Sequence, residues 1–270
     1  MNIYNIGGDS LSSLWGKEEQ EVSNAYNKSG VLIWTKIPLL DTVIINALFP
    51  INLSGTKQGG CTDGEYIYQT CWDSSNYTYM DIIKYKISDG TYTTKHFDGT
   101  PNFGHANDMT YNPNDGYLYV CTMLDDGSVI VINPADLSYV KTVYVNDQLG
   151  SPYRVWQICY DRITSRFLSA HGNDFLFYDN EWNYLSSIEF PTHPSATGQG
   201  CETDGVYVYR VTYNPNLIDV ATMDGIYVKT MSNPMTGEPE TMAYDWAGHY
   251  YIIKNSSTDV FYSAQLFATN

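Results

Sequence analysis

Short runs of alternating apolar and polar residues, separated by turn-forming residues, recur along the whole chain. In residues 58–68 (QGGCTDGEYIY) a short run is followed by an Asp-Gly turn and a second run with tyrosine on one face. This arrangement is typical of two antiparallel strands joined by a tight turn. No segment has the apolar repeat of three to four residues that marks a helix. The pattern therefore predicts an all-β protein.

The same stretch recurs at residues 199–209, where seven of eleven positions are identical. Three looser copies lie elsewhere, and the polar residues that open the five turns are Asp63, Asn112, Asp161, Asp204 and Asp245. The intervals between them are 49, 49, 43 and 41 residues. This is the length of a four-stranded propeller blade. The sequence predicts a five-bladed β-propeller with blades starting at about residues 56, 104, 154, 198 and 239.

The two ends of the repeat region predict how the ring is closed. The last repeat has room for three strands where the others have room for four, and an unpaired edge strand promotes aggregation. The apolar, β-branched stretch at about residues 41–49 is therefore expected to supply the missing outer strand. Residues 1–37 do not match the repeat. We expect them to form an arm for attachment or oligomerisation, and residues 38–270 to form the propeller.

Composition excludes several classes of partner. The formal net charge is −16, with only 14 Lys and Arg residues against 30 Asp and Glu. Binding to nucleic acid needs basic patches, and so does binding to an anionic membrane surface. No nucleic-acid partner and no membrane insertion are expected. Tyrosine is unusually frequent, with 25 copies, and suits strands that are half-buried.

The five cysteines show no CxxC pair and no histidine at metal-ligand spacing. The sequence predicts no structural disulfide, no metal site and no cofactor. Residues 1–6 lack the basic start and long apolar run of a secretory signal. We expect a protein that is made in the cytoplasm and reaches a virion or the extracellular space by another route.

The chemistry is expected where the first strands of the blades converge on the axis of the ring. Amides, carboxylates, one imidazole, one guanidinium and one indole fall a few positions before the five turns. Amides and carboxylates match the hydroxyl groups of a sugar, and an aromatic ring can stack on its apolar face. The predicted ligand-binding residues are Gln58, His105, Asn107, Asp108, Arg154, Trp156, Gln157, Gln199 and Glu240.

Two other interpretations of these polar side chains remain open. They could satisfy one another and channel waters, and so only hold the blades together. They could also be catalytic, with Asp108 and either Glu202 or Glu240 as the acid and base of a glycosidase. His105, Arg154 and a tyrosine of the channel could instead abstract the proton next to a uronate carboxyl group, as in a polysaccharide lyase. Whether the protein is an enzyme stays open, and binding without catalysis is favoured.

Several stretches carry resemblances to two kinds of known protein. Residues 104–113 (GHANDMTYNP), the two Gln-Gly…Thr-Asp-Gly stretches and residues 237–240 (GEPE) resemble an uncharacterised five-bladed propeller family of Gram-positive bacteria and their phages. Residues 24–30 (NAYNKSG) and the strand after them resemble hairpins of phage tail and baseplate proteins.

The resemblance implies a tail-associated receptor-binding protein of a phage or prophage. Its propeller would recognise host cell-surface carbohydrate for host attachment. Its arm would contact other virion proteins, and a homotrimer would be a suitable state for such a protein. The alternatives are a glycoside hydrolase or polysaccharide lyase acting on surface polysaccharide, and a non-catalytic structural or decoration protein.

Overall fold

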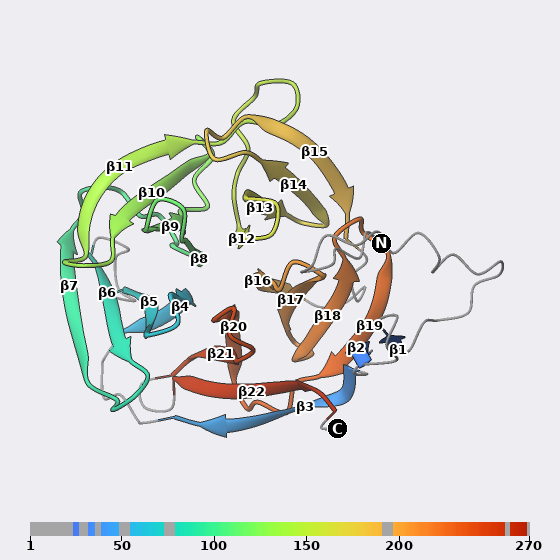
Figure 1. The fold of residues 1–270 in the computed structure, drawn as a ribbon. Coiled ribbons are helices and arrows are strands. Elements are labelled where there is room, and N and C mark those ends of the chain that lie inside the picture. Colours follow the sequence, from blue (N-terminus) through green and yellow to red (C-terminus); the bar gives the residue numbers. More distant parts are fainter. Residues whose placement is uncertain are drawn as a thin grey trace. The chain divides into compact units, whose positions relative to one another are not determined.

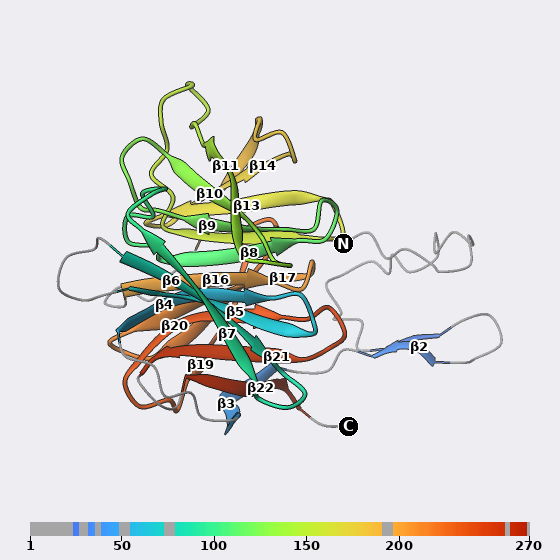
Figure 2. The same ribbon diagram turned by 90° about the vertical axis from the view of Figure 1, so that its left-hand side faces the viewer.

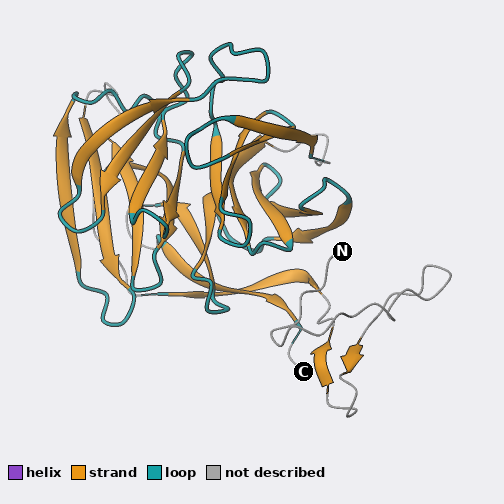
Figure 3. Ribbon diagram, turned by 45° about the horizontal axis from the view of Figure 1, so that its top comes forward, coloured by secondary structure: helices purple, strands orange, loops and turns teal. Residues whose placement is uncertain are grey.

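The computed structural model contains strands and loops and no helix among the residues it describes (Figure 3). These are residues 24–26, 32–35, 39–48, 55–72, 79–190, 197–256 and 260–268. The chain divides into two compact units, one of Met1–Pro38 with Phe267–Asn270 and one of Leu39–Leu266. In the first unit, β1 (Asn24–Tyr26) pairs with β2 (Leu32–Thr35) in antiparallel fashion. The remainder of the predicted arm lies outside the described residues.

The second unit consists of sheets arranged around a common axis (Figure 1). Three sheets have four strands each, in sequence order. Their strands are β4 (Thr56–Thr62), β5 (Tyr66–Trp72), β6 (Tyr79–Lys86) and β7 (Tyr92–Asp98); β8 (Asp108–Asn112), β9 (Tyr117–Cys121), β10 (Ser128–Asn133) and β11 (Ser138–Tyr144); β12 (Gln157–Asp161), β13 (Arg166–His171), β14 (Asp174–Tyr178) and β15 (Tyr184–Glu189).

A fourth sheet has eight strands. Their order is β16 (Thr197–Thr203), β17 (Tyr207–Tyr213), β18 (Leu217–Thr222), β19 (Tyr227–Ser232), β3 (Leu39–Ala47), β22 (Phe261–Phe267), β21 (Tyr250–Asn255) and β20 (Glu238–Tyr244).

Five strands lie innermost in this ring: β4, β8, β12, β16 and β20 (Figure 1). Each contacts the next, and β20 contacts β4, so the cycle of inner strands is closed. This is the arrangement of a β-propeller, and the predicted all-β propeller is confirmed. The number of separate sheets differs from the prediction, because the strands assigned to the fourth and fifth repeats belong to one sheet.

Strand β3 joins the two halves of the eight-stranded sheet, since it lies between β19 and β22 (Figure 2). It pairs in parallel with β19 at Thr42 and Ser232. The Lys229 ammonium lies 2.6 Å from the Asp41 carboxylate, while Val43 is buried. The strand expected at about residues 41–49 is therefore present, and its partners on both sides leave neither β19 nor β22 as an open edge.

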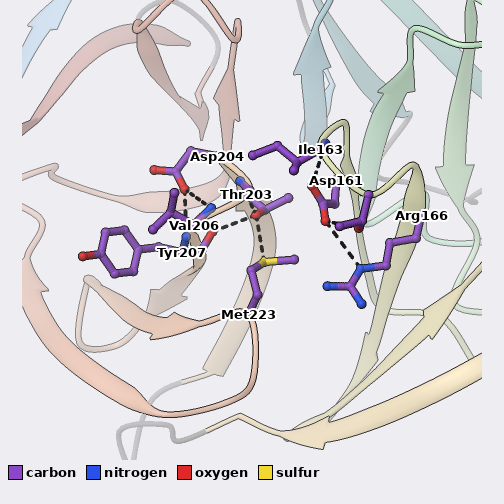
Figure 4. Close-up of polar contacts among 10 residues, drawn as sticks. Asp161, Ile163, Arg166, Thr203, Asp204, Val206, Tyr207 and Met223 are labelled. Carbon is purple, nitrogen blue, oxygen red and sulfur yellow. Dashed lines mark hydrogen bonds and ion pairs between the residues drawn. The ribbon is translucent and has the colours of Figure 1, made fainter. Parts of the chain in front are cut away.

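The identical residues of the two best repeats form the same turn. In the second copy, Asp204 Oδ1 accepts hydrogen bonds from the backbone N–H of Val206 (2.9 Å) and Tyr207 (2.8 Å) (Figure 4). The Thr203 hydroxyl donates to the Tyr207 carbonyl (2.7 Å). The Tyr209 hydroxyl then donates to Asp204 Oδ2 (2.6 Å). A single aspartate thus fixes both the turn and the strand that follows it.

The first copy repeats these contacts. Asp63 Oδ1 accepts from the N–H of Glu65 (2.9 Å) and Tyr66 (2.8 Å), and Asp63 Oδ2 accepts from the Tyr68 hydroxyl (2.6 Å). The Thr62 hydroxyl donates to the Tyr66 carbonyl (2.7 Å). Because the side chain and backbone of one short segment make all of these bonds, the repeat was recognisable in the sequence.

Glycine at the start of the repeat has a different role. A Cβ atom on Gly59 would lie 2.4 Å from the Asn107 carbonyl oxygen, and one on Gly200 would lie 2.3 Å from the Thr241 hydroxyl. Contacts this short are excluded for a side chain. Glycine therefore lets β4 and β16 approach the neighbouring inner strands closely near the axis.

Replacing Tyr68 with Phe removes the phenol that donates to Asp63 and leaves a carboxylate oxygen without this bond. We expect the free energy of unfolding to fall by about 1.5–3 kcal/mol, the range for hydrogen bonds to charged groups. Urea denaturation measures the change. Tyr92→Phe, at an exposed tyrosine, is the control and should have almost no effect. Equal stabilities of the two variants would contradict the proposed role of the phenol.

Candidate ligand-binding site at the axis

Irregular backbone marks one end of three of the five inner strands, about five residues before the turn residues. The register shifts between Lys57 and Gly60 in β4, between Gly198 and Cys201 in β16, and between Pro239 and Thr241 in β20. Bulges of this kind redirect side chains and are frequent beside functional sites. The residues at this position in the five repeats are Gln58, Asn107, Trp156, Gln199 and Glu240. We call this end of the strands the pocket end, and the opposite end the turn end.

A cavity of about 290 Å³ opens at the pocket end. Its lining residues are Thr56, Gln58, Trp72, His105, Gln199, Glu238 and Asn255. Gln58, His105 and Gln199 are among the predicted ligand-binding residues. The other four come from the ends of β4, β5, β20 and β21, which the repeat alignment did not single out.

Hydrogen bonds orient most polar groups of this cavity. Glu238 accepts from the side-chain amides of Gln199 (2.9 Å) and Asn255 (3.1 Å). Gln58 is 4% exposed, and its Oε1 has no hydrogen-bond partner among the described residues. A buried acceptor without a partner is costly, so a donor from a ligand or water would stabilise it.

His105 forms one wall of the cavity. Its Nδ1 lies 3.2 Å from Asn107 Oδ1, and its ring meets the Trp72 ring edge-on at 4.9 Å. Burial lowers the pKa of His105 below its usual value of about 6.5. The imidazole is therefore neutral at pH 7 and contributes no positive charge to the cavity.

Asn107 and Gln157 lie behind the cavity. The Asn107 amide donates to the carbonyls of Trp156 (2.8 Å) and Gln199 (2.8 Å), and so connects three inner-strand segments. Gln157 is 1% exposed, and its Oε1 has no hydrogen-bond partner in the described part of the chain. Both residues were predicted to bind ligand; neither is in the cavity lining, and Asn107 contacts the lining residues His105 and Gln199.

Asp108 is completely buried at the start of β8. Its Oδ2 accepts from the backbone N–H of Ile158 (3.0 Å) and Cys201 (3.0 Å). Its Oδ1 accepts from the Thr241 hydroxyl (2.8 Å) and from its neighbour's N–H at Met109 (3.0 Å). One carboxyl group thereby joins β8 to β12, β16 and β20. Burial raises its pKa to about 8, although these hydrogen bonds act in the opposite direction.

Glu202 and Glu240 are also buried. Glu202 accepts from the N–H of Thr203 (2.8 Å) and Tyr244 (3.1 Å), and burial raises its pKa to about 8. Burial likewise raises the pKa of Glu240, whose Oε1 has no partner among the described residues. Neither residue lines the cavity, and both oxygens of Glu202 bind the backbone. The hydrogen bonds of Glu202 are those of a structural carboxyl group.

Arg154 and Trp156 lie beside the cavity and do not line it. Arg154 Nε donates to the Met123 carbonyl (2.6 Å) and lies 3.5 Å from an Asp125 carboxylate oxygen. Its guanidinium carbon is 5.5 Å from the centre of the Trp156 ring, on which His171 stacks at 4.7 Å. The Trp156 ring is therefore already in contact with two side chains, and the indole in the cavity wall is Trp72.

Other kinds of site were also sought in the structure. Among the described residues, no group of three His, Cys, Asp or Glu side chains is placed to hold a metal ion. All five cysteines are buried and free. The described part of the chain contains no helix that is long and apolar enough to span a bilayer.

Comparison with known proteins identifies the fold. No protein-family model and no curated protein sequence matches the chain. Among solved structures, glutaminyl cyclase from Myxococcus xanthus is similar with a TM-score of 0.60 at 10% identity, over 86% of this chain and 100% of that one. Regucalcin, a calcium-binding protein from Agrobacterium tumefaciens, is similar with a TM-score of 0.50 at 10% identity, over 82% and 96% of the two chains.

The tail fiber of Staphylococcus aureus phage P68 is similar with a TM-score of 0.54 at 12% identity, over 82% of this chain. The match spans 52% of the tail-fiber chain, about half of its length. At such low identities these three proteins share the propeller fold with this chain, and their activities differ from one another.

Replacing Asp108 with Ala leaves several buried N–H groups of three inner strands without an acceptor. Since each such group costs about 1–3 kcal/mol, the free energy of unfolding should fall by at least about 3 kcal/mol. Chemical denaturation followed by circular dichroism measures this change. Asp98→Ala, at an exposed aspartate on β7, is the control and should change stability by less than about 0.5 kcal/mol. A mild effect of Asp108→Ala would exclude the structural role.

The raised pKa values of Asp108 and Glu202 also predict a pH dependence of stability. Their pKa is about 8 in the folded protein and about 4 in the unfolded chain, so the folded state binds more protons between these values. The free energy of unfolding should therefore fall as pH rises from 5 to 8, by at most about 1.4 kcal/mol per pH unit for each group. Glu202→Gln should make this slope shallower in denaturation series. A flat profile from pH 5 to 8 would contradict the assignment.

Proposed function

We propose that this chain is a receptor-binding protein of a phage or prophage tail, and that its propeller binds host cell-surface carbohydrate in the cavity at the pocket end. The observation that carries this proposal is the lining itself. It combines side-chain amides, a carboxylate, a neutral imidazole and an indole around a buried acceptor, Gln58 Oε1, that has no partner among the described residues.

The lining matches the chemistry of a sugar. Gln58 Oε1 is an acceptor for a sugar hydroxyl, and the amide–carboxylate pair of Gln199 and Glu238 offers both donors and acceptors to neighbouring hydroxyls. Trp72 and His105 supply ring surface for the apolar face of the sugar. A volume of about 290 Å³ lies at the lower end of the range for ligand sites and suits a single sugar unit.

The charge of the cavity lining narrows the class of sugar that it could bind. Among the described lining residues, Glu238 is charged and none is Lys or Arg. Arg154, which would be the partner of an acidic sugar, bonds instead to Met123 and Asp125 outside the lining. The cavity therefore favours a neutral or amino sugar over a uronic acid.

We count the ring as five blades. In this count β16 to β19 form the fourth blade, and β20 to β22 with β3 form the fifth, since among the described strands the two groups are paired only through β3. The fold likeness to part of a phage tail fiber supports a tail protein, because it shows that such fibers accommodate a propeller. In this proposal the protein is on the virion, the segment before β3 contacts other tail proteins, and trimerisation multiplies a weak affinity for sugar.

The enzyme alternatives have less support. A glycosidase needs an acid and a base that reach the substrate, whereas Asp108, Glu202 and Glu240 are buried away from the cavity lining. A purely structural or decoration protein would bind no carbohydrate at all, which the following experiment distinguishes.

The test is binding of the full chain to a glycan array and to host cells. Gln58→Ala removes the buried acceptor and should weaken binding by about tenfold or more, because the loss of one well-placed hydrogen bond is worth about 1.4 kcal/mol. Gln148→Ala, at an exposed glutamine, should leave binding unchanged. Unaltered binding by Gln58→Ala, or no binding of any glycan by the wild type, would contradict the proposal.

Catalysis is tested separately by incubating the protein with host cell-wall polysaccharide. We expect neither new reducing ends nor 4,5-unsaturated products. Formation of either product that is lost in Glu238→Gln would reassign the cavity to an enzyme.

A further inference from the structure

The turn end of the inner strands has a cluster of aromatic rings around one arginine. Arg162, in the turn after β12, has its guanidinium carbon 5.7 Å from the centre of the Tyr111 ring and 5.3 Å from that of Trp246. Trp246 in turn lies 5.3 Å from the Tyr244 ring. These four residues, which we call the turn-end cluster, come from three inner-strand regions far apart in the sequence. All four are partly exposed.

The two tyrosine hydroxyls of this cluster do not take part in the hydrogen bonds that stabilise the repeats. Elsewhere in the repeats the phenols of Tyr68, Tyr119 and Tyr209 donate to the aspartates of their own turns, at 2.5–2.6 Å. The hydroxyls of Tyr111 and Tyr244 make no hydrogen bond to any residue that the structure describes. They are therefore free to bind a ligand or solvent.

The guanidinium of Arg162 likewise has no ion-pair partner in the described part of the chain. Its Nε is buried and has no hydrogen-bond partner within the described ranges, and none of the described carboxylates forms an ion pair with it. The nearby acids have other partners: Asp161 lies 3.4 Å from Arg166 (Figure 4). Asp245 lies 2.6 Å from His249.

A partly buried positive charge without a paired anion is unfavourable. Burial lowers the pKa of Arg162, which reflects this cost. Glu202, the carboxyl group with the largest electrostatic effect on Arg162, accepts hydrogen bonds from the backbone N–H of Thr203 and Tyr244 and forms no ion pair with Arg162. An external carboxylate would supply the direct ion pair that none of the described carboxylates forms with Arg162.

Backbone strain at Trp246 gives an independent indication. Its φ is +62°, in the left-handed region that favours glycine. The equivalent positions of the two best repeats are Gly64 and Gly205, with φ of +100° and +81°. A tryptophan therefore occupies a turn position at which its positive φ costs about 1 kcal/mol or more. Backbone strain of this kind is typical of functional sites.

We propose that the turn-end cluster is a second ligand site, which binds a carboxylate group attached to a sugar ring. The guanidinium of Arg162 would bind the carboxylate through two parallel hydrogen bonds. The exposed parts of the Tyr111 and Trp246 rings, which Arg162 leaves uncovered, would contact the apolar face of the sugar, and the Tyr244 hydroxyl would bond to a sugar hydroxyl. This site is separate from the cavity at the pocket end and selects the opposite class of sugar, an acidic one.

Ligand-observed NMR with glucuronate, and with glucose as its uncharged counterpart, tests the proposal on the full chain. The wild type should bind glucuronate at least about tenfold more tightly than glucose. Arg162→Gln should remove this preference, and Arg162→Lys should restore only part of it, because an ammonium lacks the planar pair of donors. Lys95→Gln, at an exposed lysine on β7, should behave like the wild type.

Trp246→Gly is the second variant, and it distinguishes loss of the site from loss of the fold. Glycine relieves the positive φ, so the melting temperature should stay the same or rise while the affinity for glucuronate falls. Equal glucuronate affinities of the wild type and Arg162→Gln would overturn the proposal. So would a loss of glucuronate binding in Gln58→Ala, since the ligand would then occupy the cavity at the pocket end. If the cavity at the pocket end binds no neutral sugar, the proposed function fails, but the glucuronate test of the turn-end cluster still stands.

Discussion

The buried carboxyl group of Asp108 is the interaction on which the centre of the ring depends. It accepts hydrogen bonds from residues of three other inner strands. These inner strands are not paired with one another, so the carboxyl group provides a link between them that backbone pairing does not. The geometry explains why an acid is found where no solvent reaches it. The close approach of β16 to β20 that Gly200 allows brings Cys201 and Thr241, on these two strands, within reach of this one side chain.

Much of the fold could be predicted from the sequence, because the repeated turn is held by contacts within a few residues. The Asp63 and Asp204 turns, with their tyrosines, are visible as a pattern of identical residues. The single eight-stranded sheet could not be predicted. It depends on β3 pairing with β19, which is about 190 residues away in sequence, and one parallel residue pair leaves no recognisable pattern.

The candidate site was partly predictable for the same reason. Gln58 and Gln199 occupy a fixed place relative to the turn, and the structure puts both in the lining of one cavity. Glu238 and Asn255 could not be recognised, because the bulge in β20 and the ends of outer strands decide which side chains face the cavity. Sequence position alone also does not separate a lining residue from a buried one such as Asp108, since that difference depends on the packing of neighbouring sheets.

Strand β3 has a mechanical consequence. It is the first segment of the second unit, so any tension applied to the chain before Leu39 is transmitted to the ring through this strand. Its neighbours on the two sides, β19 and β22, are formed from the last quarter of the chain. A pull on the N-terminal segment is therefore shared between β19 and β22, the two neighbours of β3 in the ring.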